Sequence, residues 1–177
     1  MEIEFVATNQ ISNLQLESFQ QLRGAVYPAE VLATLPGTQF VWAAPQWSIL
    51  VWDEDELVSR VGLLTRQILS NGETKLIGGI GGVMTHPDKQ GKGYASQAMK
   101  EAAKRFDSEF GVAFALLFCR LHLIEFYKRL QWKPFEGQVF VEQPQRQIEF
   151  SANDAMVLDV REQAPLNGIL DLDGLPW

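Results

Sequence analysis

A glycine-rich turn is the segment of this sequence best suited to chemistry. From Gly79 to Met99 the chain reads GIGGVMTHPDKQGKGYASQAM, and its central turn spans residues 90–95. A turn that leads from a strand into a helix leaves several backbone N–H groups unpaired, and the helix dipole favours an anion there. Gly91 and Gly93 let a ligand approach the backbone, and Lys92 adds positive charge. The turn therefore predicts a phosphate or pyrophosphate site.

The spacing of the glycines narrows the choice of ligand. The dinucleotide fingerprint G-x-G-x-x-G fails because Ser96 stands where the third glycine belongs, and the P-loop pattern G-x-x-x-x-G-K-[ST] is absent. The pyrophosphate of an acyl-coenzyme A is the third candidate. A plain strand-turn-helix unit without a ligand is the alternative to all three.

The elements that must position this turn follow from hydrophobic periodicity and turn residues. Strands are predicted at residues 2–7, 47–53, 57–69, 74–85, 112–118, 132–141 and 155–160. Helices are predicted at 13–26, 27–37 and 121–130, and a further one follows Gly93 and ends near Gly111. Asn71-Gly72 predicts a hairpin in an antiparallel meander, whereas the apolar run at 112–118 fits a buried strand with a parallel neighbour. The tail at 161–177 is loop-like, and together these elements predict a single α+β domain with one mixed sheet.

Composition limits the classes of partner. The 177 residues are 46% hydrophobic and 21% charged, with a formal net charge of −7, which is ordinary for a globular domain. A negative surface argues against nucleic acid and membranes as partners; it suits a cationic substrate, or serves solubility alone. With one cysteine, Cys119, and no secretory pattern at the start of the chain, a cytoplasmic location is expected.

Two motifs resemble one enzyme family. Gln90-x-x-Gly93-x-Ala95 matches the Q/R-x-x-G-x-G/A signature of the GNAT superfamily of N-acetyltransferases, and EFYKRLQW, from Glu125 to Trp132, resembles its FYEKLGF-like segment. The resemblance covers roughly residues 51–141. It implies a mixed sheet that splays between its fourth and fifth strands, with acetyl-CoA as co-substrate. The pyrophosphate would bind the turn and the pantetheine arm the preceding strand, which assigns the cofactor to Val83, Met84, Thr85, Gln90, Gly91, Lys92, Gly93, Tyr94 and Ala95.

The same resemblance implies a direct attack of an amine on the thioester. It places Tyr127 near the sulfur of coenzyme A as a general acid, with a core tyrosine as the alternative reading. A backbone N–H near Val83 or Met84 would be the oxyanion donor. The general base stays open among dispersed carboxylates: Glu30, Asp53 to Glu56, Glu125, Asp171, Asp173 and the C-terminus of Trp177. Cys119 is expected in the core, and His86 and His122 lack metal-ligand spacing, so no metal is predicted.

The C-terminal end resembles the aminoglycoside 2′-N-acetyltransferase branch of this family. WKPFEGQVFV and the ending DLDGLPW carry that resemblance, which implies that the tail docks near the active site and that Trp177 supplies a terminal carboxylate there. A disordered tail is the alternative. Gly81 stands where the branch has a glutamate, Phe118 or a neighbour replaces its serine, and Leu175-Pro176 replaces its acidic residue, so a less charged amine is equally compatible.

These features predict an N-acetyltransferase that moves an acetyl group from acetyl-CoA to a primary amine of a small molecule. Gly81, Phe118 and Asp173 are the substrate-side candidates, and the glycines at 79, 81 and 82 predict room at the reacting end of the cofactor. Aminoglycoside 2′-N-acetylation is one alternative function. A GNAT-fold protein that binds acyl-CoA without catalysis is another, and the chain is expected to be a monomer or a homodimer.

Overall fold

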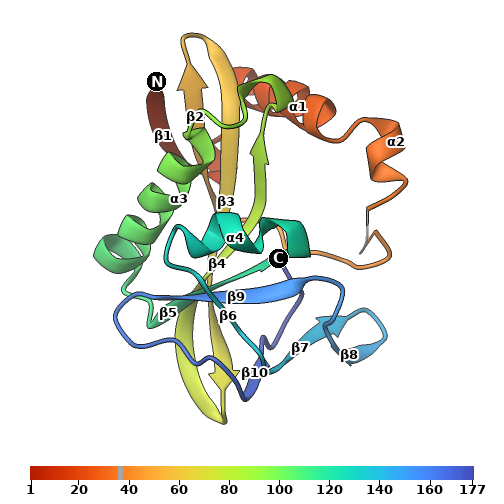
Figure 1. Cartoon of the computed structure of the whole chain (residues 1–177), viewed down its shortest axis with the longest axis vertical. Helices are drawn as coiled ribbons and strands as arrows, with labels where there is room; N and C mark the ends of the chain where they lie inside the picture. The colour runs from red at the N-terminus through yellow and green to blue at the C-terminus, as the bar shows by residue number, and fades with distance from the viewer. Residues whose placement is uncertain (36–37) are drawn as a thin grey trace.

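The computed structural model of the chain describes residues 1–35 and 38–177. A mixed sheet of ten strands forms its centre, and four short to medium helices flank the sheet (Figure 1). The strands are β1 (Glu2–Ala7), β2 (Trp47–Asp53), β3 (Glu56–Ser70), β4 (Glu73–Thr85), β5 (Phe114–Cys119), β6 (Lys133–Pro134), β7 (Gln138–Gln143), β8 (Arg146–Glu149), β9 (Asp154–Asp159) and β10 (Ile169–Asp171). The helices are α1 (Asn13–Val26), α2 (Ala29–Leu32), α3 (Tyr94–Arg105) and α4 (Ile124–Lys128).

The strands β2, β3 and β4 form the predicted antiparallel meander, and β1 adds to its edge. β2 pairs with β1 and β3, and β3 continues into β4 through a tight hairpin at Asn71-Gly72. Both turn residues have positive φ, 51° and 84°, as a two-residue turn that matches the twist of its strands requires. The helix at 27–37 is confirmed only for α2, and its predicted end at 36–37 lies outside the described residues.

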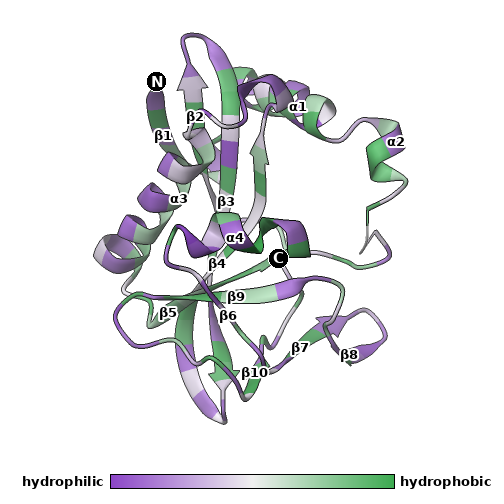
Figure 2. Ribbon diagram, viewed as in Figure 1, coloured by the Kyte–Doolittle hydropathy of each residue, from purple (hydrophilic) through white to green (hydrophobic). Residues whose placement is uncertain are grey.

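The two faces of the meander are covered by different helices. Ile49 and Val51 on β2 belong to the core that contains Ala98 and Met99 of α3, whereas Leu50, between them, packs with Leu22 of α1. Alternation along a strand sends neighbouring side chains to opposite faces, so α1 and α3 lie on opposite sides of the sheet. Hydrophilic residues mark the outer side of α3 (Figure 2). Among the described helices, none is long and apolar enough to cross a membrane.

The sheet opens between β4 and β5. These strands run parallel, and they pair only at Gly78–Ala115, Gly79–Leu116 and Ile80–Leu117. Beyond Ile80, β4 has no partner on that side, while β5 continues alongside β9. This confirms the predicted splay between the fourth and fifth strands of an α+β fold with one mixed sheet.

A bulge lies on β4 at the point where the strands separate. Gly62 on β3 faces Gly81, but Arg60, two residues earlier, faces Met84, which leaves Gly82 and Val83 without strand partners on β3. Gly82 has a φ of 57°, a conformation that a side chain disfavours. The bulge therefore turns the backbone of β4 toward the opening.

The C-terminal third differs from the sequence-based expectation in three places. The strand predicted at 132–141 is two strands, β6 and β7, because the chain bends at Gly137, whose missing side chain leaves room for the backbone of Gly168. β8 was not predicted, and the predicted helix 121–130 shortens to a 3-10 turn at Leu121–Leu123 followed by α4.

The helix expected to end near Gly111 is α3 followed by a π turn at Phe106–Phe110.

The tail is part of the sheet rather than a loop throughout. Its strand β10 lies between β3 and β7, antiparallel to β3 and parallel to β7 (Figure 1). The expectation of a loop was therefore wrong at Ile169–Asp171. A strand of three residues with one buried side chain, Leu170, has too little pattern to be recognised in isolation.

Candidate active site

The glycine-rich turn forms the N-terminus of α3. Gly93 is the N-cap with a φ of 88°, and Gly91 has a φ of 76°. No side chain caps the helix, so its first N–H groups have no side-chain partner. A Cβ at either glycine would meet nothing within 4 Å, which shows that the space in front of the turn is open. These residues fit an anionic ligand such as a pyrophosphate.

Charged neighbours hold the turn against the β2–β3 hairpin. The Tyr94 hydroxyl donates to Oδ2 of Asp53 at 2.7 Å, and Nζ of Lys89 lies 3.2 Å from the same oxygen and 3.0 Å from Oε2 of Glu56. The Tyr94 hydrogen bond and then Lys89 hold the pKa of Asp53 below its usual value. Lys92, by contrast, is exposed and pairs with no carboxylate of residues 1–35 and 38–177. Lys92 is thus the cation available to a ligand at the turn.

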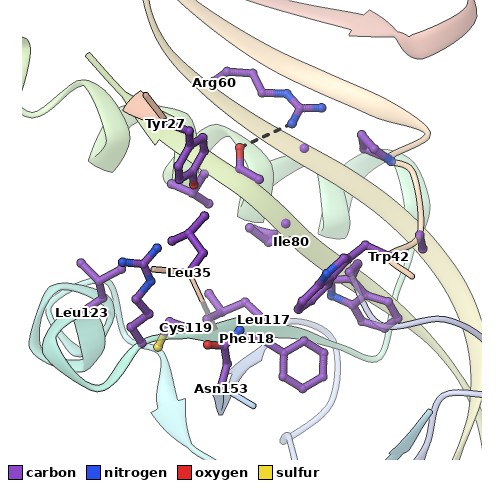
Figure 3. Close-up of a pocket in the computed structure, with 18 of the residues that line it drawn as sticks. Tyr27, Leu35, Trp42, Arg60, Ile80, Leu117, Phe118, Cys119, Leu123 and Asn153 are labelled. Carbon is purple, nitrogen blue, oxygen red and sulfur yellow. Dashed lines mark hydrogen bonds between the residues drawn. The ribbon is translucent and has the colours of Figure 1, made fainter. Parts of the chain in front are cut away.

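The opening between β4 and β5 leads into a cavity of about 440 Å³. Arg60 and Tyr27 lie on one side of it, and Phe118, Cys119 and Asn153 on the opposite side (Figure 3). Residues Gly81 to Val83 of β4, which do not pair with β5, form part of the cavity wall. Tyr127 and Trp177 also line it. The cavity therefore brings together residues from α1, β3, β4, β5, α4 and the end of the chain.

Tyr127 lies on α4 with its ring buried. The ring packs against Phe126 and Trp132, with centroids 5.0 Å and 6.5 Å away. Burial raises the pKa of Tyr127 above its usual value of 10.0, and the nearby Cys119 adds to this. No group in the described part of the chain hydrogen-bonds its hydroxyl, which leaves that hydroxyl available to a ligand in the cavity.

Trp177 fills the space above the glycines of β4. Its indole Nε1 donates to the carbonyl oxygen of Leu116 at 3.1 Å, and a Cβ at Gly79 would overlap the ring. A Cβ at Gly81 would lie 3.0 Å from the carboxyl carbon of Trp177. The room predicted from the glycines at 79 and 81 is therefore occupied by the end of the chain itself.

Arg66 on β3 fixes this end of the chain. Its guanidinium lies 5.1 Å from the centre of the Trp177 ring, and its Nη1 donates to the carbonyl oxygen of Leu175 at 2.7 Å. The carbonyl oxygen of Pro176 accepts from the backbone N–H of Ala43 at 2.7 Å. The carboxyl carbon of Trp177 is consequently held beside Gly81, and the residue is buried.

The other sequence candidates are distributed unevenly. Phe118 lines the cavity and lies edge-on to Phe150 at 4.7 Å. Asp173 is exposed, outside the cavity lining, and its N–H donates to Oδ1 of Asp171, which lies on β10. Gln90 reaches back to β4, where its Nε2 donates to the carbonyl oxygen of Thr85 at 3.5 Å. Of the three substrate-side candidates, the structure brings Gly81 and Phe118 to the cavity.

Sequence reasoning missed the positive side chains of the cavity. Arg60 is only 8% exposed, yet it lines the cavity, as do Arg23 from α1 and Arg120 after β5. The signal was present for Arg60, because it is a lone charge in the otherwise buried stretch from Leu57 to Leu64. Arginine is almost never buried without a reason, so such a residue marks a site.

Metal and thiol chemistry find little support in the described residues. They contain no cluster of His, Cys, Asp and Glu that could hold a metal ion. Cys119 is buried, and this burial raises its pKa to about 11, so its thiol is protonated at neutral pH.

Comparison with known proteins places this geometry in a family. A search of curated proteins finds no match, but the family model described as an acetyltransferase (GNAT) domain matches residues 8–135. Escherichia coli ElaA is similar in structure with a TM-score of 0.62 and 21% identity, over 89% of this chain and 99% of that chain. A GNAT family acetyltransferase from Brucella melitensis, solved with acetyl-CoA, has a TM-score of 0.57 and 15% identity over 96% and 94%.

A third similar structure is the N-acetyltransferase YlbP of Bacillus subtilis, solved with coenzyme A. It has a TM-score of 0.54 and 16% identity, over 89% of this chain and 95% of that chain. At these identities the structures show the shared fold, while the family model covers well over half of the sequence. The chain therefore belongs to the GNAT family of acetyltransferases and is an acyltransferase of that type.

Proposed function

We propose that the chain transfers the acetyl group of acetyl-CoA to a primary amine of a small molecule by direct attack. The observation that carries this proposal is the position of the Trp177 carboxyl carbon beside Gly81, in the cavity that Tyr127 also lines. A base and an acid thus face one opening at the splay of the sheet. The N–H groups at the start of α3, which no side chain caps, and the edge of β4 from Val83 to Thr85, which does not pair with β5, support acetyl-CoA as the donor.

The chain's own groups account for each proton. The terminal carboxylate of Trp177 takes a proton from the attacking amine, whose nitrogen forms a bond to the thioester carbonyl carbon as the carbon–sulfur bond breaks. The Tyr127 hydroxyl gives its proton to the departing sulfur, so the products are an amide and a free thiol. Because the bulge leaves Val83 without a partner on β3, its backbone N–H is the best-placed donor to the carbonyl oxygen.

The terminal carboxylate takes the place of a side-chain base. The aminoglycoside 2′-N-acetyltransferase branch has a glutamate where this chain has Gly81, and here the chain end approaches that position from above the strand. Glycine at 81 makes room for this approach, because a Cβ there would lie only 3.0 Å from the carboxyl carbon. None of the other carboxylates considered from the sequence lines the cavity, and Asp53 and Glu56 are engaged by Lys89 and Glu125 by Lys128.

The test measures thiol release from acetyl-CoA with a panel of primary amines. We expect turnover with the intact chain, and a fall in kcat of about 100-fold or more when Leu175 to Trp177 are removed, as for loss of a general base. A matched variant adds one glycine after Trp177, which keeps the indole but moves the carboxylate. We expect this variant to lose kcat while it keeps its affinity for coenzyme A.

Two other outcomes separate the alternatives. Turnover that survives both variants would remove the tail carboxylate from the mechanism. Tight binding of acetyl-CoA with no thiol release for any amine would instead support a non-catalytic acyl-CoA-binding protein.

A further inference from the structure

The charge of the cavity is opposite to that of the protein. The chain carries a net charge of −7, yet the charged side chains that line the cavity are Arg23, Arg60 and Arg120. No aspartate or glutamate of the described residues joins them there, and the terminal carboxylate of Trp177 is the one negative group beside them. A site for a purely cationic amine would have the reverse pattern.

Arg60 is the central member of this set because it is buried inside the wall. Its Nε and Nη2 donate to the Ser48 hydroxyl at 3.2 Å and 3.0 Å, and its Nη1 lies 3.4 Å from the carbonyl oxygen of Gly82. No carboxylate of residues 1–35 and 38–177 forms an ion pair with it. Burial lowers the pKa of Arg60 to about 10, so it remains charged at neutral pH.

The Arg60 guanidinium has N–H donors that these hydrogen bonds do not use. It carries five N–H groups, and these contacts use three of them, which leaves one on each terminal nitrogen. Two parallel donors at this spacing match the two oxygens of a carboxylate. Gly62 and Gly82 flank the guanidinium, and a Cβ at Gly82 would lie only 2.5 Å from Nη1. Because neither position has a side chain, there is room for the guanidinium in the cavity wall.

The positive and negative groups lie beside two consecutive glycines of β4, although Arg60 belongs to β3 and the carboxyl group to Trp177. Gly81 is next to the carboxyl group of Trp177, and Gly82 is next to Arg60. Arg60 and Trp177 also line the same cavity, although no ion pair joins them. A molecule whose amine and carboxylate are a few bonds apart can meet both groups at once.

We propose that the acceptor is a small amino-carboxylate compound whose carboxylate binds Arg60 while its amine faces the terminal carboxylate of Trp177. This inference rests on the proposed acetyl transfer and narrows its substrate class. Arg23, exposed at the rim, and Arg120, half-buried, add long-range attraction for an anion. A polycationic aminoglycoside would bring several positive charges to three arginines and is disfavoured.

The experiment compares amino acids with their carboxamides as acceptors. Each pair has the same amine and differs in one negative charge, and thiol release is measured together with binding by calorimetry. For α-, β- and γ-amino acids we expect kcat/KM to exceed that of the matching carboxamide by at least about tenfold, because a charged hydrogen-bonded pair is lost. An aminoglycoside and a simple alkylamine complete the panel.

Variants assign the preference to the arginines. In Arg60→Gln we expect kcat/KM for the acids to fall about 100-fold with little change for the carboxamides, and Arg60→Lys to recover part of the loss. Arg129→Gln removes an exposed charge outside the cavity and is the control. Because Arg60 is buried, Arg23→Gln is the second test: on the exposed rim, it should raise KM for the acids about twofold to fivefold, an effect that added salt abolishes.

The outcomes distinguish this inference from the proposed function. Equal use of acids and carboxamides, or an equal loss of both in Arg60→Gln, would overturn the carboxylate site and leave acetyl transfer intact. If no amine is acetylated, the proposed function fails. Calorimetric binding of an amino acid that Arg60→Gln abolishes would still establish the anion site, and its absence would refute it.

Discussion

Tyr127 and Cys119 show how one environment decides the chemistry of two reactive side chains. Both are buried near the cavity, and burial raises the pKa of each because it disfavours the charged form. For a thiol, this removes the nucleophilic thiolate. For a phenol, it preserves the proton that a general acid needs. The same desolvation therefore argues against a covalent acyl-enzyme and for proton donation by Tyr127.

Replacing Tyr127 with phenylalanine tests the acid role. We expect kcat to fall about 100-fold, the usual range for loss of a general acid, with the KM for acetyl-CoA nearly unchanged. Because the pKa of Tyr127 is raised, the wild-type enzyme should keep its activity at pH 8 to about 10 rather than lose it by phenol ionisation. Steady-state kinetics across this pH range provide the measurement.

Tyr27→Phe is the matched control, because it removes a second phenol from the same cavity. We expect its kcat to stay within about twofold to threefold of the wild type. A wild-type kcat in Tyr127→Phe would exclude the acid role.

Replacing Cys119 with alanine tests the thiol. We expect turnover to persist, with a loss of stability of about 1 to 2 kcal/mol for a smaller side chain in the core. The wild-type thiol should also react slowly with thiol reagents at pH 8, since its pKa of about 11 keeps it protonated. Complete loss of turnover in a folded Cys119→Ala variant would instead indicate a covalent intermediate.

At the scale of elements, β10 links the end of the chain to the active site. It is only three residues long, but it pairs on both sides, with β3 and with β7. Six residues further along, the ring of Trp177 lies on Gly79. The strand sets the direction of the tail, and Arg66 on β3 fixes its last turn. Catalysis by the terminal carboxylate would therefore depend on sheet formation.

A single methyl group tests this link. Gly79→Ala puts a Cβ into the Trp177 ring, so we expect a loss of about 1 to 3 kcal/mol in unfolding free energy and a fall in kcat as the chain end is displaced. Thermal and denaturant unfolding, with tryptophan fluorescence, provide the measurement.

Gly24→Ala is the control, since a Cβ there meets nothing within 4 Å and lies within α1. It should stabilise the protein by about 0.5 to 1 kcal/mol. If Gly79→Ala were as stable and as active as wild type, close packing of the Trp177 ring on Gly79 would contribute to neither stability nor activity.

At the scale of the whole molecule, the net charge is negative while the charged side chains of the cavity are positive. The surface is acidic overall, and the cation-rich cavity opens on the face of the sheet that α1 covers, since Arg23 of α1 lines it. Outside this cavity, the glycine-rich turn at residues 90–95 has its own positive charge in Lys92, while Lys89 is held by Asp53 and Glu56. The protein, negative overall, thus has positive side chains in two separate places, the cavity and the turn.

The contacts around Asp53 predict how stability depends on pH. Its pKa lies below the ordinary 3.8, mainly because Tyr94 and then Lys89 hydrogen-bond the carboxylate. The unfolded chain then binds the proton more readily, so this contribution is present above about pH 4 and is lost as pH falls through the folded pKa. We expect the melting temperature to drop below about pH 4 and Tyr94→Phe to weaken that dependence. A Tyr94→Phe variant with an unchanged acid profile would contradict this account.

Much of the fold was predictable because its signals are local. The turn at 90–95, the hairpin at Asn71-Gly72 and helix α1 each depend on residues that are neighbours in the sequence. The family match over 8–135 covers this same part of the chain. The helical position of Tyr127 was predictable for the same reason, because its motif is short and local, whereas its role as an acid stays a prediction.

The sequence by itself determined the glycine-rich turn, the meander, the splay and the family, since dihedral preferences and hydrophobic periodicity specify such elements over a few residues. Only the tertiary structure decided what the glycines of β4 are for. Gly79 and Gly81 lie about 100 residues from Trp177 in the chain, and their meeting depends on the pairing of β10 with β3. The burial of Arg60 between Gly62 and Gly82 likewise depends on a bulge that no local pattern encodes. Contacts between distant segments arise from packing of the whole sheet. They place the carboxyl group of Trp177 and the guanidinium of Arg60 beside glycines whose sequence had predicted open space.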